Sequence, residues 1–298
     1  MGTTWSARAI APSDLDHAAT DLDLRAELEA IIAEMSQWAP QSVLSRFNDL
    51  PKDACIEVSP RLDAVLRCAL RIAAETDGTF DPSLGALVEL WGFGARAPAA
   101  DTPSAEDVAG ALANAGWRKL VLDNASLRQP GGLRLDLAGI GKGYAVDALA
   151  AILIAGGCGS CLVEIGGEVR GVGVKPDGQP WWVDLEDPPL CHALPIRVAL
   201  HDLAIATSGD YRRGDVVGER RISHTLDPKT GWPLTKPPAS VSVLHASCME
   251  ADAYATALTV MGAELGAAFA SRAGLAARFV DGDGVETLSP AFAAMLED

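Results

Sequence analysis

The chain has 298 residues, of which 49% are hydrophobic and 21% charged, and its formal net charge is −16. This length allows one large domain or two small ones, and the composition is that of an ordinary soluble globular protein. The acidic balance argues against a protein that binds nucleic acid through a basic face. An anionic ligand would therefore need a local cation, a metal ion or backbone N–H groups.

No run approaches the roughly 18 apolar residues that a membrane span needs, so no transmembrane segment is expected. The stretch from Met1 to Arg8 lacks a basic region followed by an apolar core, so no signal peptide is expected. The sequence as written predicts a cytoplasmic protein, or a periplasmic one if a leader has been removed. Among the six cysteines, Cys158 and Cys161 are closely spaced, which is a weak zinc signal. Their role is left open, and no disulfide framework is expected.

The first part of the chain has mostly helical periodicity. Residues 3–10 alternate as an opening strand, and helices are predicted at 21–38, 61–75, 84–90 and 104–115. The first of these has acidic residues near its start, and the last has Ser104 as its N-cap.

Short strand-like runs dominate the remainder of the chain. Strands are predicted at 119–122, 133–137, 161–165, 169–174, 181–185, 196–200, 203–207, 239–245 and 276–280, and helices at 144–154, 250–261 and 264–273. Adjoining strands with helices inserted between groups favour an α+β fold, with mixed or antiparallel sheets flanked by helices. We expect a single domain over 1–298, helix-rich at about 11–117 and sheet-rich at about 118–298.

A glycine-rich segment runs from Asp136 to Tyr144 into a predicted helix. Glycines let the backbone approach a ligand, a helix start favours an anion, and Lys142 adds a point charge. A P-loop would need Ser or Thr where Gly143 stands, and a dinucleotide motif would need glycine where Tyr144 stands. The segment is either a phosphate-approach loop of another kind or a tight strand-to-helix turn with a solvated lysine.

Asp252 and Thr256 stand four residues apart in a predicted helix with small neighbours. This spacing puts both oxygens on one helical face, where a carboxylate and a hydroxyl suit Mg²⁺ or Ca²⁺. The alternative is that Thr256 bonds back to the carbonyl at 252 and Asp252 faces solvent.

Two further segments contain side chains whose roles the sequence leaves open. His224 could be a general base or a phosphate donor, whereas Asp227 in the same segment, 224–231, is favoured as turn chemistry. Aromatic residues at 79–82 and 91–94, and Trp38, could stack on a planar ring, although such residues more often belong to the core.

Taken together, these stretches resemble the ApbE family of FAD:protein FMN transferases. The resemblance is carried by an ordered set of motifs that covers the chain nearly end to end: Met1-Gly2-Thr3-Thr4, Ser45-Arg46-Phe47-Asn48, Phe80-Asp81-Pro82, Leu90-Trp91-Gly92-Phe93-Gly94, 136–144, Ile165-Gly166-Gly167-Glu168, 224–231 and 251–262. The order of so many short motifs makes chance agreement very improbable.

The resemblance implies a flavin transferase that binds FAD with a divalent cation, usually Mg²⁺. Such an enzyme moves FMN to a Thr or Ser hydroxyl of a target flavoprotein and releases AMP. The implied metal ligands are Asp252, Thr256 and the carbonyl of Gly139, and His224 is the implied catalytic residue. The implied flavin contacts are Met1, Trp38, Thr79, Phe80, Asp81, Asp136, Lys142 and Leu226.

The chain departs from the family pattern at several positions. Trp38 stands where tyrosine is common, and Gly141 where alanine is common. Glu164 and Glu168 stand where asparagine and aspartate are often found. Two alternative functions are kept: a Mg²⁺-dependent FAD pyrophosphatase that yields FMN and AMP, and a non-catalytic FAD carrier.

Overall fold

The computed structural model describes residues 2–95, 102–186, 188, 196–209, 215–217 and 220–296, and the backbone alone at 215–217 and 220–222. The chain forms two compact units that interleave along the sequence. The first unit comprises Met1–Ala30, Ile140–Tyr211 and Pro238–Asp298, and the second comprises Ile31–Gly139 and Arg212–Pro237. The expectation of a single domain over the whole chain stays a prediction.

The first unit is built on a seven-stranded sheet of order β1-β5-β6-β9-β12-β13-β14, in which every neighbouring pair is antiparallel. Its strands are β1 (Trp5–Ile10), β5 (Ser160–Ile165), β6 (Glu168–Val172), β9 (Leu203–Gly209), β12 (Ser240–His245), β13 (Ala276–Val280) and β14 (Glu286–Leu288). A separate hairpin joins β7 (Trp181–Asp184) to β8 (Arg197–Leu200).

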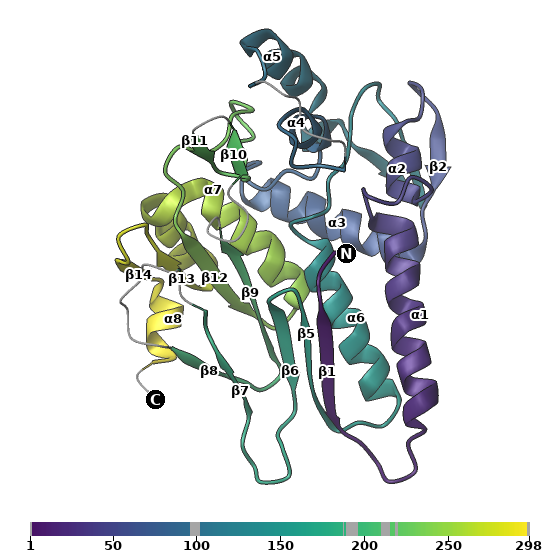
Figure 1. Ribbon diagram of the computed structural model, residues 1–298, viewed down its shortest axis with the longest axis vertical. Helices are drawn as coiled ribbons and strands as arrows, with labels where there is room; N and C mark the ends of the chain where they lie inside the picture. The colour runs from purple at the N-terminus through teal and green to yellow at the C-terminus, as the bar shows by residue number, and fades with distance from the viewer. Residues whose placement is uncertain are drawn as a thin grey trace. The chain divides into compact units, whose positions relative to one another are not determined.

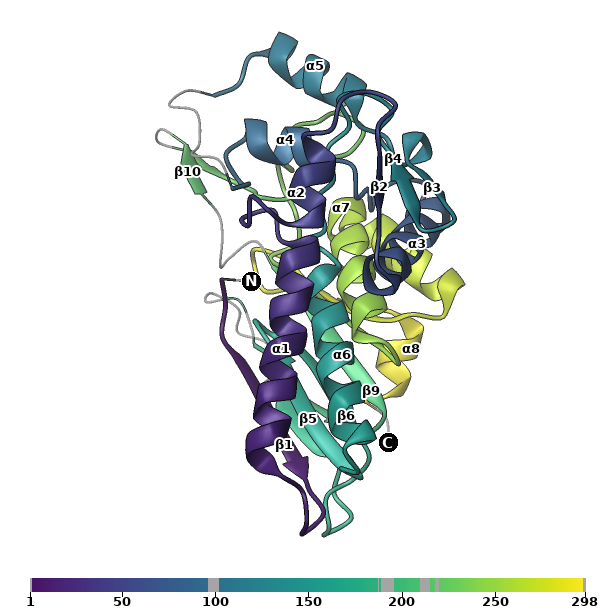
Figure 2. The ribbon, with the colours of Figure 1, turned by 90° about the vertical axis from the view of Figure 1, so that its right-hand side faces the viewer.

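Helices cover one face of this sheet (Figures 1 and 2). Helix α6 (Gly141–Ala155) packs on β5 and β6, and α7 (Cys248–Ala273) packs on β9, β12 and β13. The opposite face is covered by the β7–β8 hairpin and by α8 (Pro290–Ala294). On that face, one cross-strand row packs against side chains of the hairpin and of α8: Val169, Ile205, Leu244 and Ala276 contact the cluster that contains Trp181, Leu200 and Phe292. Burial on both faces explains why nearly every residue of β12 and β13 is buried, although β12 alternates serine with valine over 240–243 and β13 contains Arg278.

Helix α7 contains a break at Gly262, whose φ of 75° and ψ of 173° are not helical. The two helices predicted at 250–261 and 264–273 are therefore confirmed as two arms that meet at this glycine. Among the described residues, α7 is long and apolar enough to cross a membrane by length and composition alone. It packs on the sheet, and the core helix of a globular protein meets the same two criteria.

The second unit combines short helices with a three-stranded antiparallel sheet of order β2-β4-β3. Its elements are the end of α1 (His17–Met35), which starts in the first unit, then α2 (Val43–Asn48), β2 (Cys55–Glu57), α3 (Pro60–Glu75), α4 (Gly85–Leu90), α5 (Ala105–Asn114), the 3₁₀ turn Trp117–Lys119, β3 (Val121–Asp123), β4 (Ser126–Arg128), β10 (Asp215–Val217) and β11 (Arg220–Ile222). Ser104 caps α5 in a capping box with Asp107, as its sequence predicts.

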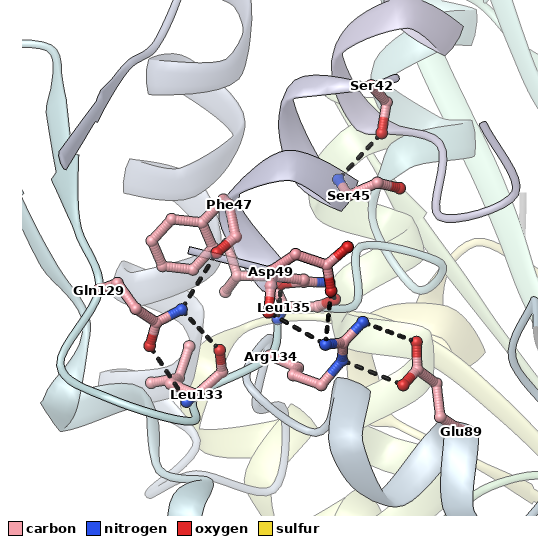
Figure 3. A network of polar contacts seen from close by, with 10 residues as sticks. Ser42, Ser45, Phe47, Asp49, Glu89, Gln129, Leu133, Arg134 and Leu135 are labelled. Carbon is pink, nitrogen blue, oxygen red and sulfur yellow. Dashed lines mark hydrogen bonds and ion pairs between the residues drawn. The ribbon is translucent and has the colours of Figure 1, made fainter. Parts of the chain in front are cut away.

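The strand predicted at 133–137 is wrong, since this segment forms an isolated parallel bridge between Arg134 and Leu84, and side chains bond the backbone of Leu133 and Leu135 (Figure 3). Asn48 Nδ2 donates to the carbonyl of Leu135 at 3.0 Å, and the Leu135 N–H donates to Asn48 Oδ1 at 2.7 Å. Gln129 bonds both backbone groups of Leu133, at 3.0 and 3.2 Å. Leu135 directly precedes Asp136, so these side-chain amides hold the backbone next to one of the predicted site residues.

Gln129→Ala is expected to lower the free energy of unfolding by about 3 kcal/mol, since it removes a fully buried amide that makes four hydrogen bonds. Urea unfolding measures the loss. The exposed Gln41 of the same unit supplies the control, and Gln41→Ala should change stability by less than about 0.5 kcal/mol. Equal effects of the two substitutions would contradict this account of the segment.

Most other predicted elements are confirmed, and the α+β prediction is confirmed by antiparallel sheets with helices. The first long helix begins at His17 instead of residue 21, because the Asp16 carboxylate accepts the N–H groups of Ala18 and Ala19, both at 3.0 Å. The elements α2, β2, β4, β10, β11, β14 and α8 are not predicted, and all of them are six residues long or shorter.

Candidate functional site

The start of α6 lies against the start of α7 in the first unit. Helix α6 begins at Gly141 with Ile140 as its N-cap, which supplies no side-chain acceptor for the first N–H groups. The Gly143 N–H donates instead to Asp252 Oδ2, at 3.0 Å. This helix start, which the sequence interprets as either a phosphate-approach loop or a tight turn, therefore already holds a carboxylate of the protein.

Gly143 is required by the contact between the two helices. A methyl group on its Cα would lie 2.6 Å from the Cys248 carbonyl carbon and 2.8 Å from Met249 Cα. The backbone of α7 occupies that space, so any larger residue at 143 would push the helices apart. This is also why the Ser or Thr of a P-loop does not fit here.

Asp252 is buried in α7, with 5% of its surface exposed, so the alternative in which it faces solvent is wrong. Burial raises the pKa of its carboxyl, whereas Lys142 and the N–H groups of Gly143 and Lys142 act to lower it. Asp252 Oδ1 lies 3.9 Å from Lys142 Nζ, so a positive charge already faces this carboxylate.

Lys142 is largely buried as well, with its side chain 24% exposed, so the alternative of a solvated lysine is also wrong. Its ammonium makes an ion pair with Glu168 of β6 and faces Asp252. Burial lowers the pKa of Lys142, but the charges of Asp252 and Glu168 outweigh burial, so the pKa lies above its ordinary value. Two carboxylates from two elements thus surround one ammonium.

Glu168 is 1% exposed, and its Oε2 is a buried oxygen without a hydrogen bond in the part of the chain that the structure describes. Burial raises the pKa of Glu168 to about 7, although Lys142 opposes that shift. Because the folded pKa exceeds the unfolded one, folding takes up a proton between pH 4.5 and about 7, and stability falls as the pH rises through this window.

Glu168→Gln is therefore expected to become more stable relative to the parent protein as the pH rises from about 5 to about 7.5, since the amide carries no charge to bury. Urea unfolding at both pH values measures the difference between variant and parent. A difference that does not change with pH would show that Glu168 does not titrate in this window.

Thr256 follows Asp252 by one helical turn and is half-buried. The hydrogen bonds of the described residues do not include a back-bond from Thr256 to the carbonyl at 252, whereas Thr259 Oγ1 does donate to the Ala255 carbonyl, at 2.8 Å. The neighbours Ala251, Ala253 and Ala255 are buried and small. A buried carboxylate, a nearby hydroxyl and the unbonded Glu168 Oε2 are hard oxygen donors, so these residues fit a cation such as Mg²⁺.

Within the described ranges, no group of three or more His, Cys, Asp or Glu side chains is arranged to hold a metal. The predicted set does not contradict this finding, because it has one carboxylate, one hydroxyl and one backbone carbonyl. That carbonyl belongs to Gly139, the last residue of the segment Ile31–Gly139 in the second unit. The metal-binding roles of Gly139, Asp252 and Thr256 stay predictions.

The second unit brings together another group of the predicted residues. Asp81 accepts the N–H and hydroxyl of Ser83, at 2.8 and 2.6 Å, and the N–H of Trp117 at 3.1 Å. Burial raises the pKa of this carboxyl, and these hydrogen bonds act to lower it. Asp81 therefore holds the turn that carries Thr79 and Phe80, and Phe80 itself is a core residue.

Asp136 lies beside this turn, because its N–H donates to the Pro82 carbonyl at 2.9 Å. Its Oδ1 accepts the Ala138 N–H, also at 2.9 Å, and burial raises the pKa of the carboxyl. The structure thus brings Asp136 next to the 79–82 turn, although the two are far apart in the sequence.

The segment 224–231 is a turn built by Asp227, as the sequence predicts. Asp227 Oδ1 accepts the Lys229 N–H at 2.8 Å and Oδ2 accepts the Thr230 hydroxyl at 3.1 Å. Leu226 packs in a cluster with Leu87, Val108 and Trp91, whose Nε1 donates to the Gly231 carbonyl at 2.9 Å. His224 is half-buried at the start of this segment, and its catalytic role stays a prediction.

Trp38 is 52% exposed, so its ring is accessible for stacking, whereas Met1 lies outside the described residues. The flavin contacts of all these residues stay predictions. Cys158 and Cys161 are free thiols, and burial raises the pKa of Cys161 to about 11, which argues against a reactive thiolate.

Comparisons with known proteins identify relatives over the whole chain. Residues 1–279 match the model of the ApbE family. The FAD:protein FMN transferase of Klebsiella pneumoniae (strain 342) is 35% identical over 99% of this chain and 87% of its own, and that of Vibrio cholerae serotype O1 is 37% identical over 91% and 82%. The apo crystal structure of the Pseudomonas stutzeri flavinyl transferase ApbE superposes with a TM-score of 0.92 at 36% identity, covering 100% of this chain and 95% of that one.

These matches confirm the resemblance stated from the motifs, the predicted fold and the prediction of a transferase enzyme. The chain belongs to the ApbE family.

Proposed function

We propose that this protein transfers the FMN half of FAD to a Thr or Ser hydroxyl of a target flavoprotein, with AMP as the leaving group. Family membership supports this proposal, because the relatives bear the name FAD:protein FMN transferase. The observation that carries it in this chain is the buried Asp252 carboxylate, with a cationic group facing it and Thr256 one helical turn away.

Asp252 and Thr256 would hold a divalent cation such as Mg²⁺, with the Gly139 carbonyl as the third protein ligand. When bound, the cation neutralises charge on the diphosphate and orients the departing AMP. Lys142 would add a second positive charge, and its ion pair with Glu168 keeps the ammonium at the start of α6.

In the transfer step, the acceptor hydroxyl oxygen forms a bond to the FMN phosphorus, and the bond from that phosphorus to the bridging oxygen breaks. AMP leaves with the bonding electron pair. His224 would take the hydroxyl proton as general base. Asp136 would hold a hydroxyl of the ribityl or ribose group. The remaining predicted contacts to the flavin nucleotide are Met1, Trp38, Thr79, Phe80, Asp81 and Leu226.

The test incubates the protein with FAD, Mg²⁺ and a candidate flavoprotein, and then measures the intact mass of the flavoprotein and the nucleotide products. The proposal predicts covalent FMN on the flavoprotein and one AMP for each FMN attached. A reaction without the flavoprotein separates the alternatives. FMN and AMP released there would indicate a pyrophosphatase, and unchanged FAD in both reactions would indicate a carrier.

A further inference from the structure

Asp147 of α6 holds the first residues of α7 through an unusually complete set of contacts. Its Oδ1 accepts the Cys248 N–H at 3.0 Å and contacts Arg170 Nη1 at 2.6 Å. Its Oδ2 accepts the Ser247 hydroxyl at 2.8 Å and the Met249 N–H at 3.0 Å. The carboxylate thus satisfies two N–H groups at the start of α7, and its negative charge complements the dipole of that helix.

Asp147 and Gly143 are four residues apart, so they lie on the same face of α6. Cys248 is held between them. Its N–H is bonded by Asp147, and its carbonyl group packs against Gly143 Cα with no room for a methyl group. These two contacts fix the position of α7 along the axis of α6, and they limit the rotation of α7 about its own axis.

Asp252 follows Cys248 by one helical turn and therefore lies on the same face of α7. It accepts the Gly143 N–H at 3.0 Å and faces Lys142 at 3.9 Å. A slip of α7 by a fraction of a turn would carry Asp252 away from both partners. The placement of the Asp252 carboxylate thus depends on the contacts made by Asp147.

We propose that Asp147 is a positioning residue for the Asp252 carboxylate and thereby for the divalent cation, an inference that rests on the proposed function. Asp147 itself touches neither the cation nor the flavin nucleotide in this account. Asparagine is the informative replacement, because it keeps the shape of the side chain but puts an NH₂ group in place of one acceptor oxygen. That NH₂ group would face either the donors Ser247 and Met249 or the donors Arg170 and Cys248.

The first measurement is native-state hydrogen exchange of the Gly143 amide, followed by NMR on the full chain without FAD or metal. In the parent protein this N–H is bonded to Asp252 and should be protected. In Asp147→Asn its protection should fall by about tenfold more than that of amides in β12 and β13, corresponding to about 1.4 kcal/mol of local opening. Uniform loss of protection over the whole unit would overturn the proposal, since it would indicate a role in stability alone.

The second measurement is Mn²⁺ binding, followed by electron paramagnetic resonance. Loss of a residue that orients a metal ligand costs about 10- to 100-fold in affinity, so Asp147→Asn should weaken Mn²⁺ binding by that factor. Ser289→Ala is the matched control, because Ser289 is the buried N-cap of α8 in the same unit and contacts neither α6 nor the start of α7 among its hydrogen bonds. It should lower stability and leave Mn²⁺ binding and the Gly143 amide unchanged. Equal Mn²⁺ affinity in Asp147→Asn and the parent protein would overturn the proposal.

Neither measurement requires turnover, so the positioning role of Asp147 and the proposed transfer reaction are tested independently of each other. If the parent protein binds Mn²⁺ but attaches no FMN to a flavoprotein, the proposed function fails while the positioning role is still decided by the variant. If transfer is confirmed and Asp147→Asn binds Mn²⁺ as the parent does, the positioning role alone is wrong.

Discussion

Asp252→Ala is expected to lower kcat/KM for flavin transfer by at least about 10³-fold, because it removes the single carboxylate among the three proposed metal ligands. A bound cation contributes several kcal/mol to a phosphoryl transfer, and about 1.4 kcal/mol corresponds to a tenfold change in rate. The variant should lose affinity for the metal more than for FAD. The measurements are transfer kinetics at several Mg²⁺ concentrations and FAD binding by fluorescence.

Glu264→Ala supplies the control on the same helix, since Glu264 is an exposed acid in the second arm of α7. It changes the net charge as Asp252→Ala does and should leave transfer unchanged. Asp252→Asn adds a second comparison, because the amide keeps an oxygen for the Gly143 N–H but loses the charge. Full activity in Asp252→Ala would mean that the metal is held elsewhere.

Gly143→Ala is expected to destabilise the protein by about 3 kcal/mol, because the added methyl group would overlap the backbone of α7 at Cys248 and Met249. Backbone atoms cannot rotate away as a flexible side chain can, so the two helices must separate. The same displacement would pull Asp252 from its partners and lower transfer activity. Urea unfolding measures the stability, and the transfer assay measures the second effect.

Gly141→Ala is the matched substitution two positions earlier in the same helix. A methyl group at Gly141 meets nothing within 4 Å, and alanine is the better helix former, so stability should be unchanged or rise by up to about 1 kcal/mol. A similar loss of stability at both glycines would show that helix propensity, and not the contact with α7, governs this segment.

The parts of the fold that the sequence predicts correctly are those with strong local signals. Ser104 caps its helix, the alternating and apolar runs become strands, and Asp227 builds its own turn. The strand expected at 133–137 fails partly for a non-local reason, since Asn48 bonds the backbone of Leu135 from 87 residues away, whereas Gln129 bonds that of Leu133 from four residues away. Helix α8 had a readable signal in Ser289 followed by Pro290, but it is only five residues long.

The candidate site shows the same division between local and non-local information. The spacing of Asp252 and Thr256 is visible in the sequence, but the burial of Asp252 and its bond to Gly143 arise from the pairing of α6 with α7. The sequence alone interprets Lys142 as a solvated lysine or a phosphate ligand. Its ion pair with Glu168 of β6 becomes visible only in the structure. Asp147 gives no signal at all, because Ser247, Cys248 and Met249 are about a hundred residues away and Arg170 is 23 residues away.

The proposed function requires that Asp252 and Thr256 hold the cation that binds the diphosphate of FAD. Anomalous diffraction from crystals grown with FAD and Mn²⁺ tests it directly, since the manganese position is read without reference to any assay. We expect a manganese ion bonded to the Asp252 carboxylate, the Thr256 hydroxyl and phosphate oxygens of FAD. Manganese bound at other residues, with the Asp252 carboxylate contacting Lys142 and Gly143 alone, would contradict it.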